Sequence, residues 1–333
     1  MNLTIEKTLY YTTLFISYIE KILSCYINIY NLTMMKRRNF LKTTAAASVS
    51  IPFLSSAALT INNPYVAQMG VQLYTVRDQM ENDPVATLKA IKEAGYAQIE
   101  GGDVRAYQEL TPIMQDLGLT SSSTFFPWSF ITGRWDLVEQ EKPKNYSFEK
   151  MVDDAVKYNF KYLVFGYMVE GERETLDDYR KVAEQLNRAG ELCQKAGIDL
   201  CYHNHAFEFE PMEGQVPFRI LMEEFEPSTV FFELDVFWAS LAGHDPIGLM
   251  KEMPKRIKLL HLKDKKPNTP TMFDHNQVPH DTFQELGDGV VEITKIMQLA
   301  KEIGVEQCFV EQDQSPNPVA SINQSMSYLR SNL

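Results

Sequence analysis

The stretch that most constrains the fold is Val230–Trp238, which reads VFFELDVFW. It is short, rich in β-forming residues, and carries two acids. If it forms a strand, alternation places Phe231, Glu233 and Asp235 on one face and only apolar side chains on the other. Such a strand is expected in a closed parallel barrel, where outward residues pack beneath helices and inward residues at the carboxyl end form a site. The simpler alternative is that Asp235 only caps the next segment.

The rest of the chain favours a barrel, because strand-like and helix-like segments alternate along it. Apolar runs predict eight strands, at 70–74, 97–100, 119–125, 162–167, 198–205, 230–235, 257–263 and 308–313. Helical patterns predict helices at 83–94, 104–117, 146–158, 175–196, 216–225, 245–253, 290–303 and 319–329. This alternation is the signature of an α/β protein of the (β/α)8 TIM-barrel class, with outer helices around an eight-stranded parallel barrel. A doubly wound open sheet is the runner-up, and the lack of Gly-x-Gly-x-x-Gly after the first strand weakens its dinucleotide-binding form.

Polar side chains recur at the predicted carboxyl ends of these strands. They are Glu100, His203, His205, Asp235, His261, Lys263 and Glu311. Parity puts His261 and Lys263 on one face of the seventh strand, and Glu311 and Asp313 on one face of the eighth. A strand-end histidine alone is more often a structural residue. Carboxylates and imidazoles that converge on one barrel mouth, however, suit Mn²⁺, Zn²⁺, Co²⁺ or Mg²⁺, so the joint pattern predicts a divalent metal site.

Five motifs along the chain carry a resemblance to a known family. They are Tyr202-His-Asn-His-Ala-Phe-Glu-Phe209, Glu233-Leu-Asp235 with Ala242-Gly-His-Asp-Pro246, Leu260-His-Leu-Lys-Asp264, Glu285-Leu-Gly-Asp-Gly289 and Phe309-Val-Glu-Gln-Asp313. Together they resemble the sugar phosphate isomerase/epimerase group of xylose-isomerase-like TIM barrels over residues 66–332. The order and spacing of the motifs are specific for the family, and they leave the reaction open.

The resemblance implies four ligands for a divalent metal: an acid on the fifth strand, Asp on the sixth, His on the seventh and Glu on the eighth. Three carry over directly, as Asp235, His261 and Glu311. The fifth strand departs from the pattern, because His203 stands where the ketose epimerases have Glu and the nearest acid is Glu208 in the next loop. Either His203 binds the metal or Glu208 folds back to it. Carboxylate donation fits the charge balance of the family, which slightly favours Glu208 as the fourth metal ligand.

The resemblance also implies roles for the side chains around the metal. Glu311 is expected to be both ligand and base, and His203 and His205 are the candidates for the other acid–base group. Lys263 is expected to stabilise an enediolate, unless it pairs with Asp264 or is a solvated rim charge. The expected substrate contacts are Glu100, Trp128 and Trp238, and the alternative for Glu100 is that it supports a metal ligand from behind. Trp128, Trp238 and also Trp135, which lies in the same aromatic loop as Trp128, can equally be packing residues.

These features predict a metal-dependent sugar isomerase or epimerase that removes a proton next to a carbonyl through a metal-stabilised enediolate. A 3-keto-glycoside eliminase or hydrolase begins with the same step and is the first alternative. A non-catalytic sugar-binding TIM barrel is the second, because the fifth strand departs from the family. Apurinic endonucleases share the fold, but a net charge of −12 and only six histidines argue against a nucleic-acid partner and a three-zinc site. A homo-oligomer is compatible with the sequence.

The N-terminal residues are predicted to lie outside the barrel. Residues 35–60 run from basic through weakly apolar to small residues, the layout of a signal peptide, and Arg37-Arg38-Asn39-Phe40-Leu41-Lys42 resembles the twin-arginine export signal. Residues 1–34 are expected to be a mis-called start or an N-terminal extension. The catalytic domain is expected to span residues 61–333. The enzyme is therefore expected in the periplasm, or membrane-associated if the leader is not cleaved, with the export machinery as a partner and an unphosphorylated sugar or keto-sugar as substrate.

Changing Arg37 and Arg38 together to Lys keeps the charge but removes the paired guanidinium groups of the export signal. We expect the precursor of this double variant to accumulate in the cytoplasm, while the wild-type protein is processed and reaches the periplasm. Cell fractionation with immunoblotting measures the distribution. Normal processing of the double variant in the periplasm would show that the twin-arginine assignment is wrong.

Overall fold

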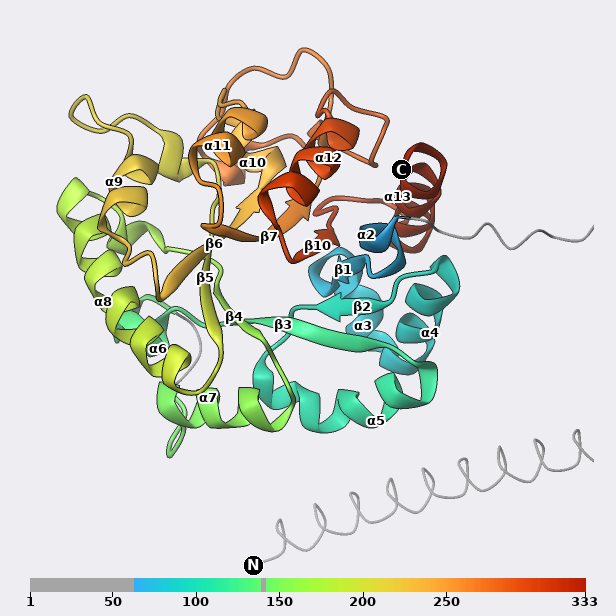
Figure 1. Cartoon of the computed structure of the whole chain (residues 1–333), viewed down its shortest axis with the longest axis horizontal. Coiled ribbons are helices and arrows are strands. Elements are labelled where there is room, and N and C mark those ends of the chain that lie inside the picture. Colours follow the sequence, from blue (N-terminus) through green and yellow to red (C-terminus); the bar gives the residue numbers. More distant parts are fainter. Residues whose placement is uncertain (1–62, 139–141) are drawn as a thin grey trace, which may run out of the picture. The chain divides into compact units, whose positions relative to one another are not determined.

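Eight short parallel strands pair edge to edge into a closed barrel surrounded by helices (Figure 1). The computed structural model describes residues 63–138 and 142–333, so the expected leader lies outside the described residues. Around the ring the strands follow the order β1-β10-β7-β6-β5-β4-β3-β2. Their bounds are β1 (Gly70–Gln72), β2 (Gln98–Glu100), β3 (Thr120–Phe126), β4 (Tyr162–Phe165), β5 (Asp199–His203), β6 (Val230–Asp235), β7 (Ile257–Leu262) and β10 (Gln307–Val310). The predicted TIM barrel is confirmed, and the open sheet is excluded because β1 pairs with both β2 and β10.

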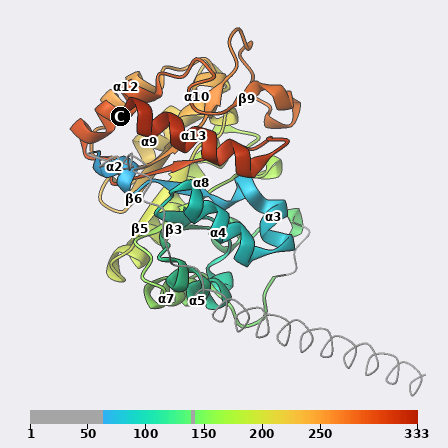
Figure 2. The ribbon, with the colours of Figure 1, turned by 90° about the vertical axis from the view of Figure 1, so that its right-hand side faces the viewer.

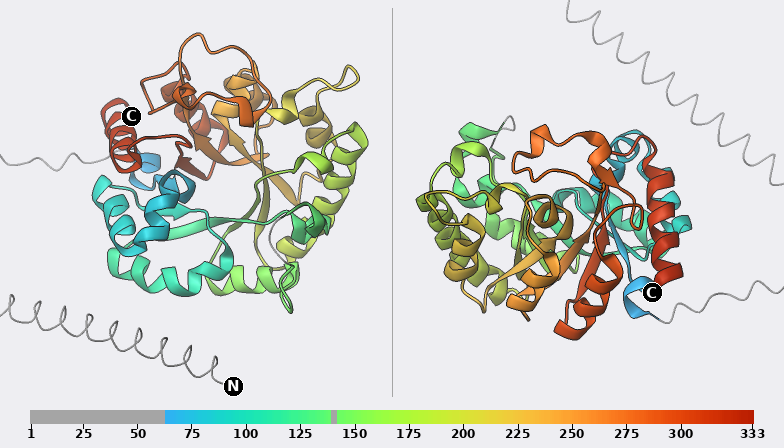
Figure 3. Two further views of the ribbon diagram at one scale, coloured as in Figure 1. Left: turned by 180° about the vertical axis from the view of Figure 1, so that it is seen from behind. Right: turned by 90° about the horizontal axis from the view of Figure 1, so that it is seen from above.

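Helices follow the strands and cover the outside of the barrel, as the two views of Figure 3 show. The longer ones are α4 (Pro84–Ala94), α5 (Tyr107–Leu117), α7 (Phe148–Lys157), α8 (Leu176–Lys195), α9 (Pro217–Glu224), α11 (Pro246–Glu252), α12 (Ile293–Ile303) and α13 (Pro318–Asn332). Shorter helices that the sequence pattern did not predict are α2 (Pro64–Ala67), α3 (Arg77–Asn82), α6 (Ser129–Thr132) and α10 (Val236–Leu241). In the segment between β7 and α12, β8 (Asp264–Lys265) and β9 (Phe283–Gln284) form a small antiparallel pair.

The helix boundaries follow the capping residues that the sequence supplies. Asp83 accepts a hydrogen bond from the backbone of α4, Pro84 occupies its first turn, and Gly95 ends it with φ of 100°. At the start of α8, Thr175 and Asp178 form a reciprocal capping box. These local signals explain why the predicted helix positions agree closely with the observed ones.

The barrel has separate apolar layers outside and inside its wall. On β6, Phe232 and Leu234 pack outward beneath the helices, while Phe231 packs against the interior group. That interior group consists of the buried side chains Tyr162, Val164, Cys201, Leu259 and Phe309. The predicted alternation along β6 is confirmed, and apolar residues fill the barrel interior below the polar strand ends.

Two glycines make room for the aromatic rings inside the barrel. A Cβ atom on Gly70 would lie 2.2 Å from Phe309 Cδ1, and one on Gly166 would lie 2.2 Å from Phe125 Cδ1. Neither distance is compatible with a side chain at the glycine position. The Phe125 ring that packs on Gly166 also contacts His203, with ring centroids 5.5 Å apart. Gly166 therefore helps to position the aromatic ring that lies against this strand-end histidine.

Several strands end earlier than the sequence pattern predicts. β1 ends at Gln72, β5 at His203 and β10 at Val310. The residues after these ends turn over the barrel mouth instead of extending the sheet, as in the 3-10 turn Leu73–Val76. In each case the strand-like sequence runs two or three residues beyond the last residue that pairs with a neighbouring strand.

The last helix, α13, closes the ring beside α4, as Figure 2 shows. The Tyr96 hydroxyl donates a hydrogen bond to the backbone oxygen of Ile322 at 2.9 Å, which joins the segment before β2 to α13. Among the residues that the structure describes, no helix is long and apolar enough to cross a membrane.

A group of ion pairs links the beginnings of several strands, at the end of the barrel opposite to the polar strand ends. Glu306, which precedes β10, lies 2.5 Å from Lys258 Nζ and also contacts Lys161 Nζ. The Tyr162 hydroxyl donates to its Oε2 at 2.7 Å. Partial burial opposes ionisation, but Lys161 and Lys258 outweigh it and lower the pKa of Glu306 from 4.5 to about 2.

Replacing Glu306 by Gln should therefore destabilise the barrel at neutral pH, by about 1 kcal/mol after allowance for solvent screening. Because the folded-state pKa is depressed, this contribution is present above pH 4.5 and is lost as the pH falls toward 2. Thermal unfolding at pH 7 and pH 3 measures the difference. Glu302→Gln, at an exposed position on α12, is the matched control and should change little. A Glu306 effect that is equal at both pH values would contradict the assignment.

Candidate metal centre and active site

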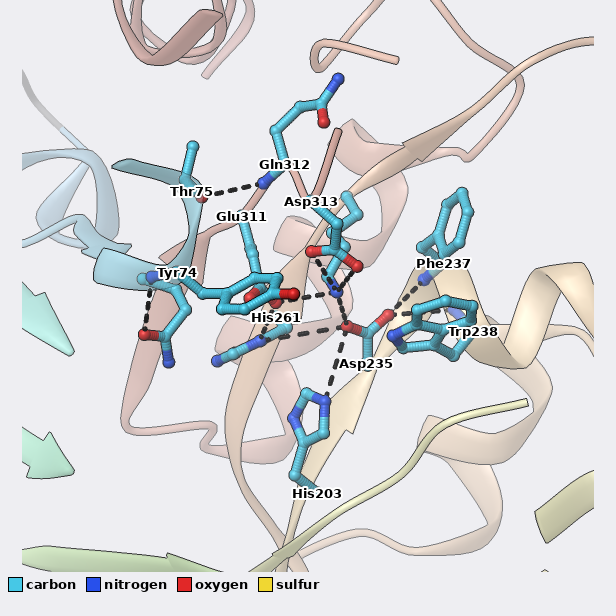
Figure 4. A network of polar contacts seen from close by, with 12 residues as sticks. Tyr74, Thr75, His203, Asp235, Phe237, Trp238, His261, Glu311, Gln312 and Asp313 are labelled. Atoms are coloured by element: carbon cyan, nitrogen blue, oxygen red, sulfur yellow. Dashed lines mark hydrogen bonds and ion pairs between the residues drawn. The ribbon is translucent and has the colours of Figure 1, made fainter. Parts of the chain in front are cut away.

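Most of the polar side chains predicted at the strand ends meet at one mouth of the barrel, and Figure 4 shows His203, Asp235, His261 and Glu311 there. His203 ends β5, Asp235 ends β6, and His261 is the penultimate residue of β7. One ligand atom from each of these three residues lies within 4.8 Å of the others. Glu311 follows β10 directly, and its Oε2 lies 2.8 Å from His261 Nδ1. The structure thus brings together three of the four expected metal ligands and adds His203.

Each of the two imidazoles is held from behind by a buried carboxyl group. His203 Nδ1 lies 3.0 Å from Glu233 Oε2, which leaves Nε2 facing Asp235 Oδ2 at 3.9 Å. His261 Nε2 lies 2.5 Å from Glu100 Oε2, which leaves Nδ1 for the group at the mouth. Glu100 and Glu233 have no exposed surface. Metal-binding histidines have this arrangement, because a carboxylate on the second nitrogen fixes the tautomer and the orientation of the ring.

The two carboxylate oxygens of Asp235 do different things. Oδ1 accepts hydrogen bonds from the backbone N–H groups of Phe237 at 2.9 Å and Trp238 at 3.0 Å, so Asp235 caps α10. Oδ2 lies 3.0 Å from Lys263 Nζ but has no well-directed hydrogen bond within the described residues. Capping and site formation are therefore compatible: one oxygen fixes the side chain, and the other remains available to a cation.

Lys263 lies among carboxylates and is not a solvated rim charge. Its side chain is 3% exposed, and Nζ lies 2.8 Å from Glu311 Oε2 and 3.1 Å from Asp313 Oδ1. Asp264 does not pair with it. The Asp264 carboxylate instead accepts hydrogen bonds from the backbone N–H groups of residues 287, 289 and 291, which anchors the loop before α12.

The surroundings shift the protonation of the candidate ligands in different directions. Burial alone would lower the pKa of His261, but Glu233, Glu311 and Glu100 raise it well above its ordinary value, so a metal bound there would displace a proton. Burial, with His261 and His205 nearby, puts the pKa of His203 well below its ordinary value, so the ring stays neutral and keeps a free lone pair. Burial alone would raise the pKa of Glu311, but Lys263 and His261 hold it well below its usual range. Glu311 is therefore ionised at neutral pH and able to accept a proton.

Glu208 lies apart from this group, in the 3-10 turn Phe207–Phe209. Its Oε1 accepts a hydrogen bond from the Tyr202 hydroxyl at 2.8 Å, and its Oε2 accepts one from the backbone N–H of His205 at 2.8 Å. Tyr202 belongs to the apolar layer outside the barrel wall, and burial raises the pKa of Glu208 to about 7. The expectation that Glu208 is a metal ligand does not fit this placement, because both of its oxygens shape the loop after β5.

A cavity of about 1310 Å³ opens over the group, and its lining includes His203, His261, Lys263 and Glu311. Aromatic rings form much of its wall, among them Phe125, Trp128, Tyr167, Trp238 and Phe283. Four lining nitrogens have no hydrogen-bond partner within the described part of the chain: Trp128 Nε1, Trp238 Nε1, His205 Nδ1 and His275 Nδ1. Because buried polar atoms are normally paired, these atoms are available to the polar groups of a bound molecule.

The expected substrate contacts divide into two kinds. Trp128, Trp238 and His205 line the cavity. Glu100 does not, since its fully buried carboxyl group contacts His261 and accepts a hydrogen bond from Gln72 Nε2 at 3.2 Å. The expectation that Glu100 contacts substrate does not fit this placement. Trp135 also lies outside the cavity lining and packs edge-on against the Phe130 ring, with centroids 4.9 Å apart.

Sequence reasoning missed the contribution of β1 to the mouth. Gln72 and Tyr74 both line the cavity, and Gln72 also holds Glu100. The signal was present, because both residues share the strand parity of Gly70, which faces the barrel interior. It was overlooked because neither residue type is a metal ligand or a common general base.

A family model described as "Xylose isomerase-like TIM barrel" matches residues 88–332, which includes every strand after β1. The chain belongs to this family. The resemblance seen in the motifs is confirmed. Proteins similar to this chain are named as isomerases, epimerases and a dehydratase.

This xylose-isomerase-like barrel is similar to curated enzymes over part of its length and to solved structures over most of it. An inosose dehydratase of Geobacillus kaustophilus (strain HTA426) is 28% identical over 152 residues, 44% of this chain and 49% of that protein. The chain spans about half the length of the curated relatives it matches. A sugar phosphate isomerase/epimerase from Parabacteroides distasonis ATCC 8503 has a TM-score of 0.64 at 24% identity, covering 87% of this chain and 97% of that chain. The zinc-bound IolI protein has a TM-score of 0.59 at 14% identity, covering 79% and 97%.

The side chains of this family member fit a divalent metal. Five buried carboxyl groups surround two imidazoles and one ammonium group: Glu100, Glu233, Asp235, Glu311 and Asp313. Three of their oxygens lack hydrogen bonds within the described residues: Glu100 Oε1, Glu233 Oε1 and Asp235 Oδ2. Ionising this many buried carboxyl groups around a single ammonium group is costly, and a divalent cation would offset that cost. His203, Asp235, His261 and Glu311 would hold the ion, with mixed nitrogen and oxygen donors of the kind Zn²⁺, Co²⁺ and Mn²⁺ accept.

His203→Ala should lower the affinity for Zn²⁺ or Mn²⁺ by at least roughly 10-fold, because it removes a ligand that its outer carboxylate orients. Glu208→Gln should leave that affinity unchanged, because both Glu208 oxygens are engaged elsewhere. Calorimetric titration of metal-free protein measures both, with circular dichroism to verify the fold. The opposite pattern, with a loss only in Glu208→Gln, would return the ligand role to Glu208.

Proposed function

We propose that this protein is a metal-dependent enzyme that removes the proton next to the carbonyl group of a keto-sugar. The observation that carries the proposal is the placement of Glu311. Its ionised carboxylate adjoins His261 of the candidate metal group and lines a cavity with ring nitrogens that have no hydrogen-bond partner among the described residues. A base beside a cation site, in a cavity with free hydrogen-bonding groups, is what α-proton abstraction from a sugar requires.

A bound divalent ion would polarise the carbonyl and favour the negative charge that develops there. The chain itself supplies the other functions. Glu311 takes the proton from the α-carbon. Its protonation weakens the contact with the Lys263 ammonium at 2.8 Å, and the N–H that this releases donates a hydrogen bond to the developing oxyanion. His205, which lines the same cavity and has an unpaired Nδ1 among the described residues, is the candidate for handling the second proton.

The proposed substrate is an unphosphorylated sugar or keto-sugar. The N–H groups of Trp128 and Trp238, which have no partner in the part of the chain that the structure describes, suit hydroxyl acceptors, and the two rings suit the apolar face of a pyranose. A phosphate is disfavoured by the carboxylates around Lys263. Of the Lys and Arg side chains that line the cavity, Lys263 and Arg77 are both already bound to oxygen atoms of the chain.

Isomerisation or epimerisation is the reaction that we favour. Elimination from a keto-glycoside is the second candidate, because the curated relatives are named as inosose dehydratases. Loss of a group β to a carbonyl begins with removal of the same α-proton, so the roles proposed for Glu311 and Lys263 hold for both outcomes.

We further propose that the enzyme acts in the periplasm after export by the twin-arginine route. The support is the sequence Arg37-Arg38 ahead of a weakly apolar stretch, in a part of the chain outside the described residues. A periplasmic enzyme meets few phosphorylated sugars, which agrees with the acidic surroundings of the site.

In D₂O the metal-loaded wild-type protein should introduce deuterium next to the carbonyl of its substrate, even where net turnover is slow. Glu311→Gln keeps the shape but loses the basicity, so exchange should fall by roughly 10²-fold or more. Proton NMR of unphosphorylated ketoses, inososes and 3-keto-glucosides with added Mn²⁺ measures the exchange.

The matched control is Glu109→Gln, an exposed acid at the rim of the same cavity, which should exchange at the wild-type rate. Metal content must be compared across the variants, because Glu311 is also a candidate ligand. Exchange that survives Glu311→Gln would move the base to the His203 and His205 side. Tight binding of a keto-sugar without any exchange by the wild-type protein would instead indicate a sugar-binding protein.

A further inference from the structure

The cavity extends beyond the candidate reaction centre, toward the segments after β1 and β2. Its lining there includes Tyr74, Arg77, Met80, Pro84 and Ala106. Its volume of about 1310 Å³ lies above the range of roughly 300–1,000 Å³ common for small-molecule sites. One sugar ring placed against Glu311 would leave this outer part unfilled.

Tyr74 is the prominent side chain of the outer part. It is 50% exposed, and it is the one aromatic residue among the large apolar side chains exposed in the described part of the chain. Its ring does not stand free: the Arg77 guanidinium carbon lies 4.2 Å from the ring centroid. Arg77 can cover only one face of the ring, so the exposed half leaves apolar surface available to a bound ring.

The Tyr74 segment is fastened to the residues beside Glu311. Arg77 Nη1 donates hydrogen bonds to the backbone oxygens of Tyr74 at 2.8 Å and Asp313 at 3.0 Å. The backbone N–H of Gln312 donates to Thr75 Oγ1 at 3.0 Å, a contact drawn in Figure 4. The backbone that carries the ring is therefore held in a fixed relation to the candidate base instead of moving with a free loop. A rigid exposed aromatic side chain in a cavity wall is the usual basis of a stacking site.

We propose that Tyr74 is the stacking platform of a second sugar-ring subsite, and that the substrate is a keto-sugar joined to another sugar ring. The substrate class is then a glycoside and not a free monosaccharide. This inference rests on the proposed function, because Glu311 defines where the reacting ring lies. The C–H groups on one face of a pyranose contact the Tyr74 ring, while the reacting ring occupies the inner part near Trp128 and Trp238.

Binding of unreactive sugars tests the subsite without any turnover. Metal-loaded protein would be titrated with glucose and with three glucose disaccharides, cellobiose, maltose and trehalose, by calorimetry or saturation-transfer NMR. The wild-type protein should bind at least one disaccharide roughly 5- to 10-fold more tightly than glucose. Tyr74→Ala should abolish this advantage and leave the glucose affinity unchanged, whereas Tyr74→Phe should keep most of it.

Leu192→Ala is the control, because Leu192 is an exposed apolar residue on α8 outside the cavity lining, and its profile should match the wild type. Equal affinities for glucose and all disaccharides in the wild type would overturn the inference. So would a Tyr74→Ala variant that weakens glucose and the disaccharides by the same factor. Phenyl β-glucoside is the last probe: a gain for it alone would replace the second sugar by an aromatic aglycone and overturn the proposal in its sugar form. Failure of deuterium exchange would refute the proposed chemistry and leave these binding results intact.

Discussion

The rest of the site depends on the burial of five carboxyl groups at one end of the barrel. Carboxylates removed from water must be neutralised, protonated or hydrogen-bonded. Lys263 neutralises part of the charge through Asp235, Glu311 and Asp313. His261 contacts Glu100 and Glu311, while the neutral His203 lies within hydrogen-bonding distance of Glu233. The lysine alone cannot balance the group, which is why the structure fits a divalent cation. Aromatic rings below and around the group exclude water and make each of these contacts stronger.

The fold could be predicted almost completely from the sequence, because its signals are local and repeated. Alternation on β6 and β7 separated the inward from the outward side chains, and capping residues such as Asp83 and Gly95 placed the helices within a few residues. The same parity indicated which strand-end side chains would meet. Once a closed barrel is assumed, its geometry forces residues of equal parity at the strand ends into one mouth.

The parts that were not predicted depend on where a strand stops and on which partner a side chain finds first. Sequence places Glu208 near the site, but the Tyr202 hydroxyl and the His205 backbone are closer partners for its carboxylate. Tyr74 was included in the first strand, whereas the ladder ends at Gln72 and a 3-10 turn carries the tyrosine to the mouth. Such outcomes are decided by contacts between distant segments. Strand parity indicates that Tyr74 faces the barrel mouth, but it does not show that the ladder ends before this residue.

The histidine at the end of β5 has a consequence for the kind of metal that the site would hold. Where the ketose epimerases have an acid, His203 replaces an anionic oxygen donor by a neutral nitrogen. Glu233 lies one hydrogen bond further out, at 3.0 Å from Nδ1, and fixes the orientation of the imidazole. The candidate donors are then two nitrogens and two carboxylates. Mg²⁺ favours oxygen ligands and retains bound water, whereas imidazole donors suit Zn²⁺ and Co²⁺. Replacing an oxygen donor by a nitrogen donor would therefore shift the metal preference of the site from Mg²⁺ toward Zn²⁺ or Co²⁺.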